Sequence, residues 1–189
     1  MNLKNINNKI HSDEKESQEL VKLFETGELQ IAKKKATEHL IKYPKSYVIH
    51  NILGAILAAE SKFDEAIVHY KKSIEIKFDY AEAYNNLGTA LQKSNNLEQA
   101  IFSYNNALKY KKNFAQAYNN LGAVHHKLGK FDEAINKFNQ ALKIDSKYAE
   151  AYNNLGSTFV ELGKFKEAIA NHREALKVNP NYAEGYSYL

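Results

Sequence analysis

Cysteine is absent from the sequence, which excludes disulfide bonds, thiolate metal sites and thiol nucleophiles. The 189 residues include only two prolines and eight glycines, which argues against a turn-rich all-β fold and against long linkers. No apolar run approaches the roughly 20 residues of a membrane-spanning helix. The polar N-terminus also lacks an apolar signal core. We therefore expect a cytoplasmic protein that does not enter a membrane.

Arginine is almost absent as well. Arg173 is the one arginine among 26 basic residues, and the net charge is only +4. Specific recognition of bases and phosphates relies on arginine forks, so this composition argues against specific nucleic-acid binding. Lysine clusters, such as residues 33–35 and 109–112, are typical of solvated helix faces.

The chain does contain an internal repeat. The segment AYNNLG occurs at residues 83–88, 117–122 and 151–156, 34 residues apart each time. The tyrosine, leucine and glycine of each copy fall at i, i+3 and i+4, on one stripe of a helix. A short loop and a second stretch with helical spacing follow each copy. Gly129 and Gly163 lie where the chain must reverse, in a left-handed conformation that favours glycine. Each unit is therefore predicted to be a helix hairpin.

The same frame covers nearly the whole chain. We predict a disordered or frayed N-terminal tail at residues 1–11 and a single array of hairpins at residues 12–189. The predicted repeats are 13–46 (divergent), 47–80, 81–114, 115–148 and 149–182, with a partial repeat at 183–189.

Glycine also recurs in the middle of the first helix of each hairpin, at positions 54, 88, 122 and 156. Glycine costs a helix about 1 kcal/mol relative to alanine. Its recurrence therefore predicts that the two helices of a hairpin approach too closely there for a β-carbon. We expect large side chains such as Tyr84, Leu87, Phe131 and Phe165 to fill the space around this contact.

These residues resemble the tetratricopeptide repeat. The pattern of that family is carried by Tyr118, Leu121, Gly122, Gly129, Ala134, Phe138 and Ala141, and again by Tyr152, Leu155, Gly156, Gly163, Ala168, Ala175 and Pro180. The resemblance implies an all-α, right-handed superhelical solenoid of 34-residue repeats, with first helices on the concave wall and second helices on the convex wall. It also implies a non-catalytic module that binds an extended peptide or partner protein in the concave groove.

Each copy of AYNNLG contains two asparagines. At about 100° per residue, the second asparagine falls almost opposite the apolar stripe of its helix. The chain is similar to the repeat array of O-linked N-acetylglucosamine transferase, in which an asparagine ladder holds the substrate backbone. The resemblance implies that Asn86, Asn120 and Asn154 bind the partner. The helical wheel points Thr89 and Lys93 to the same side, and we predict partner contacts at Thr89, Lys93 and Lys127 as well. The first asparagines (Asn51, Asn85, Asn119 and Asn153) are expected to be flanking or structural. The alternative is that the second asparagines only keep a face solvated, or bond to the adjacent repeat.

An aromatic residue precedes the first helix of each repeat, at Tyr80, Phe114, Tyr148 and Tyr182. We expect these residues to lock successive repeats together, with contact to a ligand as the alternative. The second residues of the repeats are acidic or neutral, including Glu82 and Glu150, which argues against a clamp for C-terminal carboxylates.

No residues form a recognisable catalytic motif. The seven histidines are scattered, and no phosphate loop, HExxH or GxSxG sequence occurs. We therefore expect no enzymatic activity, no cofactor and no metal site.

Two further hypotheses stay open beside the binding module. The array is similar to those of bacterial sulfotransferases and glycosyltransferases that carry such repeats, so it could be the substrate-recruiting arm of a larger transferase. Repeat arrays usually end in a capping helix, whereas the last repeat here is partial. We therefore expect either a fragment of a longer protein or a scaffold that self-associates through an uncapped C-terminal end.

Overall fold

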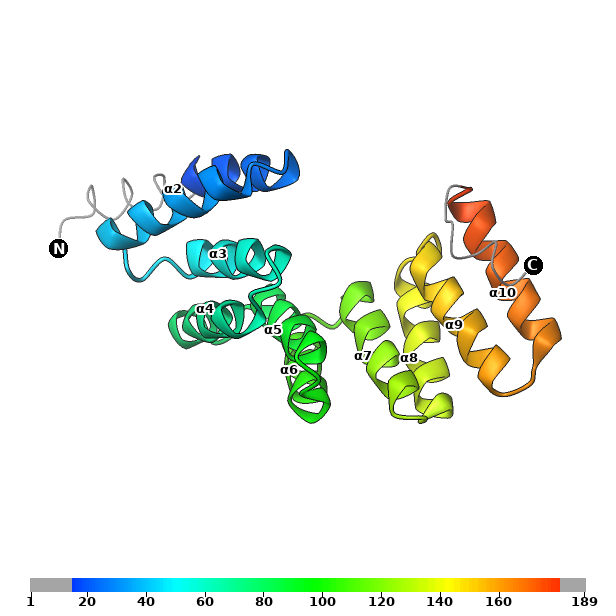
Figure 1. Ribbon diagram of the computed structural model, residues 1–189. Coiled ribbons are helices and arrows are strands. Elements are labelled where there is room, and N and C mark those ends of the chain that lie inside the picture. Colours follow the sequence, from blue (N-terminus) through cyan, green and yellow to red (C-terminus); the bar gives the residue numbers. More distant parts are fainter. Residues whose placement is uncertain (1–14, 181–189) are drawn as a thin grey trace. The chain divides into compact units, whose positions relative to one another are not determined.

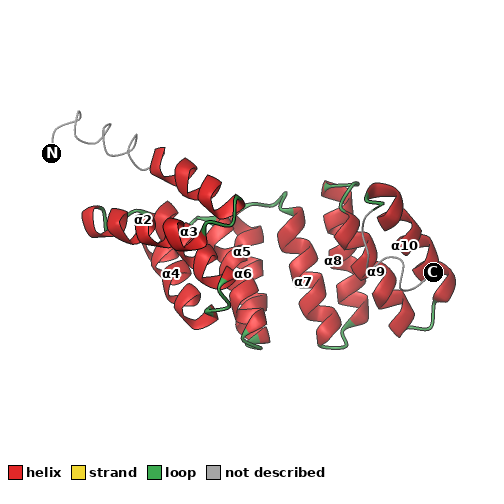
Figure 2. Cartoon of the chain, turned by 45° about the horizontal axis from the view of Figure 1, so that its top comes forward, coloured by secondary structure: helices red, strands yellow, loops and turns green. Residues whose placement is uncertain are grey.

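The computed structural model describes residues 15–180 and contains helices joined by short loops, with no strand in that range (Figure 2). The predicted tail at 1–11, the partial repeat at 183–189 and the uncapped C-terminal end lie outside the described residues. The chain divides after Asn96 into two compact units, called unit 1 and unit 2 here. Each unit is treated separately below.

Unit 1 begins with helical residues 15–25. The helices that follow are α2 (Leu29–Lys42), α3 (Tyr47–Ala59), α4 (Phe63–Ile76) and α5 (Ala81–Lys93). The helices α3 and α4 form a hairpin, α2 packs on α3, and α4 packs on α5 (Figure 1). The first helices of successive repeats, α3 and α5, also touch.

Unit 2 repeats this arrangement with α6 (Leu97–Tyr110), α7 (Ala115–Lys127), α8 (Phe131–Ile144), α9 (Ala149–Glu161) and α10 (Phe165–Val178). The pairs α7–α8 and α9–α10 are hairpins, and α8 packs on α9 (Figure 1). The first helices α7 and α9 touch each other. The prediction of an all-α array of consecutive helix hairpins is confirmed.

The turns inside the hairpins follow the predicted left-handed conformation. Gly129 and Gly163 have φ of 71° and 69°. The equivalent turn positions in the preceding repeats are Ser61 and Asn95, and both have φ of 60°. The backbone geometry of the turn is therefore shared by repeats whose turn residues differ.

The mid-helix glycines leave no room for a β-carbon, as predicted, and the atoms that fill this space belong to a ring on the facing helix. A β-carbon on Gly122 would come within 2.7 Å of the Phe138 ring, and one on Gly54 within 2.6 Å of the Tyr70 ring. His172 occupies the same place over Gly156. The prediction that Phe165 fills this space is wrong, because the His172 ring already fills it and Phe165 is 63% exposed.

Candidate functional site

The first asparagines are all buried in the array. Their exposed fractions lie between 0 and 8% for Asn51, Asn85, Asn119 and Asn153. A buried side-chain amide needs hydrogen-bond partners inside the protein. In unit 2, the Oδ1 of Asn153 accepts a hydrogen bond from the Nδ1 of buried His172, at 3.0 Å. The first asparagine is therefore part of the packing between helices.

The second asparagines (Asn86, Asn120 and Asn154) are half-buried rather than opposite the core. In unit 1, Asn86 Nδ2 donates to Asn51 Oδ1 of the preceding repeat, at 3.1 Å. In unit 2, Asn154 Nδ2 donates to Asn119 Oδ1, at 3.0 Å. For Asn86 and Asn154, the bond to the adjacent repeat that sequence reasoning left open is therefore present.

The Glu150 carboxylate determines which atom of each side-chain amide faces its neighbour in unit 2. Asn119 Nδ2 lies 3.0 Å from Glu150 Oε1, and a carboxylate oxygen can only accept. The Oδ1 of Asn119 therefore faces Asn154, and Asn154 must present its Nδ2 to that oxygen. Asn154 is left with its Oδ1 pointing away from Asn119.

Two tyrosines border these amides. Tyr80 lies directly before α5 and packs edge-on against Tyr47 of the preceding repeat, with ring centroids 5.1 Å apart. Burial, together with the charge of Glu82, raises the pKa of Tyr80 to about 12, while a hydrogen bond with Asn51 acts in the opposite direction. Burial likewise raises the pKa of Tyr148, which contacts Asn119 and Glu150. The aromatic row thus joins successive repeats in unit 1 as predicted, while Tyr182 lies outside the described residues.

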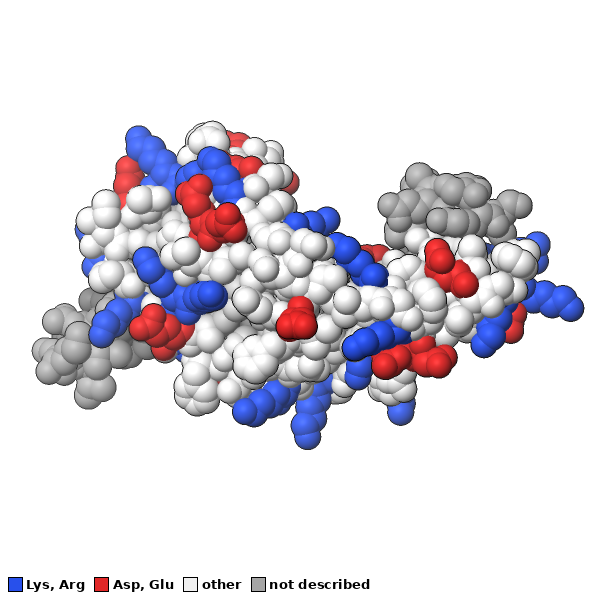
Figure 3. Space-filling model, turned by 60° about the horizontal axis from the view of Figure 1, so that its bottom comes forward, with Lys and Arg blue, Asp and Glu red and all other residues white. Residues whose placement is uncertain are grey.

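The other predicted binding residues lie on the same helices. Thr89 is half-buried and its hydroxyl donates to the Asn85 carbonyl, at 3.2 Å. Lys93 and Lys127 are the last residues of α5 and α7, and both are exposed. Lysine and acidic side chains are interspersed over the face drawn in Figure 3, without a broad area of one sign among the residues described there.

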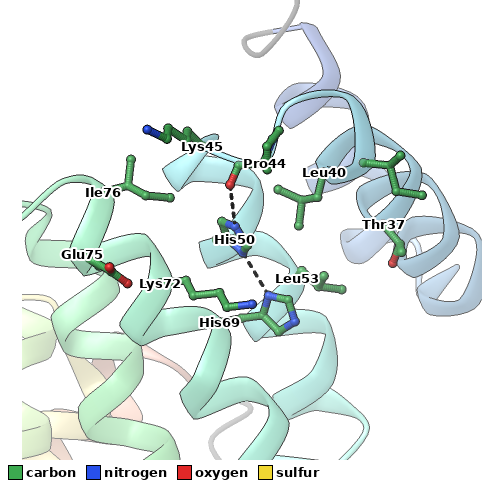
Figure 4. A pocket seen from close by; sticks show the side chains of 11 residues that line it. Thr37, Leu40, Pro44, Lys45, His50, Leu53, His69, Lys72, Glu75 and Ile76 are labelled. Atoms are coloured by element: carbon green, nitrogen blue, oxygen red, sulfur yellow. Dashed lines mark hydrogen bonds between the residues drawn. The ribbon is translucent and has the colours of Figure 1, made fainter.

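Sequence reasoning missed a cleft in unit 1. The cleft has a volume of about 790 Å³ and lies among α2, α3, α4 and the loop at Pro44 and Lys45 (Figure 4). His50 and His69 line it from facing helices, and their Nδ1 atoms are 3.1 Å apart. The two histidines are 19 residues apart, so no linear motif marks them. The one signal in the sequence is that HNILG at 50–54 departs from the YNNLG of later repeats.

The described residues contain no group of three or more His, Asp or Glu side chains that could hold a metal ion. Among the same residues, no helix is long and apolar enough to cross a membrane.

Two sequence models of one repeat family match the chain. A model described as "Tetratricopeptide repeat" matches residues 113–181, and one described as "TPR repeat" matches residues 54–95 and 93–129. No curated protein sequence matches significantly. The expected similarity to transferase arrays is not shown by these matches.

Several solved structures share the fold. The structure of MamA has 25% sequence identity to this chain and a TM-score of 0.74. The alignment covers 86% of this chain and 95% of the MamA chain. YrrB, described as a TPR protein with an unusual peptide-binding site, is 20% identical with a TM-score of 0.69, covering 89% of this chain and 87% of its own. PilW, described as a type IV pilus biogenesis factor, is 19% identical with a TM-score of 0.81, covering 94% of this chain and 90% of its own.

Proposed function

Because the chain is a tetratricopeptide repeat protein, we propose that it is a non-catalytic interaction module that binds an extended segment of a partner protein. The proposed contacts are the second asparagines, Asn86 in unit 1 and Asn120 and Asn154 in unit 2, together with Thr89 and Lys93 in unit 1 and Lys127 in unit 2. Such modules act by holding a partner, so the proposal includes no reaction and no cofactor. A cytoplasmic location stays a prediction.

The orientation of the second asparagines carries this proposal. Asn86 and Asn154 each use Nδ2 to bond to the preceding repeat. Among the described residues, no group donates to the Oδ1 of either side chain. Each amide is therefore held at one end and offers an acceptor at the other, which is a pre-organised arrangement with little rotamer entropy left to lose on binding.

The acceptors indicate what the partner must offer. An extended peptide has a backbone N–H at nearly every residue, whatever its side chains are. The Oδ1 atoms of Asn86 and Asn154 suit those N–H donors, while the Glu150 carboxylate beside Asn119 adds a further acceptor. Exposed Lys93 and Lys127 would favour acidic side chains in the same segment. The expected partner is thus an extended, unstructured segment with acidic residues.

The test is a screen of unstructured peptides against the full chain, followed by substitution of the second asparagines. We expect the triple variant Asn86→Ala, Asn120→Ala and Asn154→Ala to bind the selected peptides at least tenfold more weakly. The matched control is Asn106→Ala with Asn171→Ala, because both residues bond only to the carbonyl of their own helix, four residues back. Equal affinity of the triple variant and the wild type would refute the proposal.

A stability measurement must accompany the screen. Losing the bond from Asn86 or from Asn154 is expected to cost about 1 kcal/mol of unfolding free energy each. Asn154→Asp separates the two roles, since it keeps an outward oxygen but has no amide to donate to Asn119. For a selected peptide without acidic side chains, the proposal predicts that Asn154→Asp keeps more affinity than Asn154→Ala. The reverse order would assign the effect to the joint between repeats.

A further inference from the structure

His50 and His69 occupy positions of the repeat that face each other inside a hairpin. His50 stands where later repeats have Tyr84, Tyr118 and Tyr152, and His69 stands where they have Ser103, Lys137 and Asn171. The same two positions also meet in unit 2, where Lys137 Nζ lies 6.0 Å from the centroid of the Tyr118 ring. The repeat at 47–80 is the one that fills both positions with imidazole.

Hydrogen bonding fixes the state of both rings. His50 Nε2 lies 3.2 Å from the Pro44 carbonyl oxygen, which can only accept, so this nitrogen carries a proton. A neutral His50 then has a bare Nδ1, and His69 Nδ1 donates its proton to that atom across 3.1 Å. The two Nδ1 atoms are therefore separated only by the proton that they share. Figure 4 shows this hydrogen bond in the cleft.

We propose that His50 and His69 form a two-imidazole site for a borderline divalent metal ion such as Zn²⁺, Cu²⁺ or Ni²⁺. With Zn–N bonds of about 2.0–2.1 Å, two nitrogens on one tetrahedral ion lie roughly 3.3 Å apart, close to the observed spacing. The bond from His50 Nε2 to the Pro44 carbonyl is the outer contact that commonly orients a metal-bound histidine. To become the second ligand, His69 must move its proton from Nδ1 to Nε2, and both rings must turn so that their Nδ1 lone pairs converge on one ion.

The Lys72 charge has two opposite effects on metal binding, because it favours neutral imidazoles and also repels a cation. Lys72 on α4 faces both rings, and Lys45 and Glu75 also line the cleft. Burial, aided by the Lys72 charge, lowers the pKa of His50, while the bond to the Pro44 carbonyl acts in the opposite direction. Burial, aided by the charges of His50 and Lys72, lowers the pKa of His69 to about 4. Both rings are therefore neutral near neutral pH, which is the form that binds metals. The same lysine charge repels an incoming cation, so its removal should strengthen binding.

The site offers two protein ligands and leaves the other positions to water. Because the described residues contain no third His, Asp or Glu grouped with this pair, the affinity should fall below that of three-ligand zinc sites. The chain has no cysteine, so no thiolate competes for the metal.

The experiment is calorimetric titration of the untagged full chain with Zn²⁺, with imidazole nitrogen shifts recorded by NMR. We expect one strongest-binding ion per chain and shifts at the Nδ1 atoms of His50 and His69. His50→Tyr restores the residue of the later repeats, and His69→Ser copies Ser103, so both variants should fold and bind at least tenfold more weakly. His126→Gln, which copies Gln92, is the matched control and should bind as the wild type does.

Lys72→Gln distinguishes a cation from an anion in the cleft. The proposal predicts tighter Zn²⁺ binding by this variant. Absence of Zn²⁺ binding by the wild type, or unchanged binding by His50→Tyr, would overturn the proposal. Inorganic phosphate binding that depends on Lys72, without Zn²⁺ binding, would overturn it in favour of an anion site.

Discussion

Gly122 has no β-carbon because the Phe138 ring occupies the space where that atom would lie. The ring is fully buried, and its nearest atom would be 2.7 Å from the added carbon. Phe138 cannot move outward as an exposed side chain would, because the surrounding core is closely packed. Phe138 on the facing helix thus limits the size of the side chain that position 122 can hold.

Gly122→Ala is therefore expected to destabilise the protein. Overpacking typically costs about 1–3 kcal/mol, and alanine recovers about 1 kcal/mol of helix propensity. We expect a net loss of about 1 kcal/mol in the free energy of unfolding, measured by urea denaturation. In a Phe138→Leu background the loss should shrink or change sign, since the ring has been removed. The same loss in both backgrounds would contradict the packing argument.

The periodicity of the sequence was enough to predict that the mid-helix glycines lack room for a β-carbon, but not which side chains fill that space, and not the asparagine contacts. A helical wheel places Asn86 relative to the apolar stripe of its own helix, which faces its hairpin partner. It holds no information on the preceding repeat, whose α3 touches α5 and whose Asn51 receives the Asn86 amide. The same limit hid His50 and His69, because only the packing of α3 on α4 brings them together.

At the scale of whole helices, Glu60 joins the end of α3 to α2. Its carboxylate accepts hydrogen bonds from Gln30 at 2.7 Å and Lys33 at 2.9 Å, both on α2, and from Lys62 at 2.8 Å. The bonds from Lys33, the larger cause, and from Lys62 lower the pKa of Glu60 from 4.5 to about 2. The divergent first repeat is thus tied to the next by charged groups as well as by apolar packing.

The Glu60 contacts predict a pH dependence. Because the folded-state pKa lies below the unfolded value, the stabilisation is present above about pH 4.5 and is lost as the pH falls towards about 2. Glu60→Gln should therefore be less stable than the wild type at neutral pH, and the difference should vanish near pH 2. Urea denaturation across this range is the measurement. Added salt should shrink the neutral-pH difference because Lys33 and Lys62, which pair with Glu60, are partly exposed to solvent. A difference that is independent of pH would contradict this assignment.

At the scale of the whole molecule, the helices that pack together are neighbours in the repeat order. In unit 1, α3 packs on α2, α4 and α5, and in unit 2, α7 packs on α6, α8 and α9. An array of this kind has a stability close to the sum of its repeats and the interfaces between neighbours. A destabilising substitution in one repeat should therefore promote unfolding of the adjacent repeats before that of distant ones.

A mirrored pair of substitutions tests this locality. Leu53 on α3 and Leu121 on α7 hold the same place in their repeats and are 4% and 0% exposed. Replacing either by alanine should cost about 2–5 kcal/mol. In hydrogen-exchange mass spectrometry, we expect Leu121→Ala to speed exchange in α7, α8 and α9 while α3 and α4 keep their protection, and Leu53→Ala to do the reverse. If either substitution speeded exchange equally in both units, the chain would unfold as one cooperative body, and stability could not be assigned repeat by repeat.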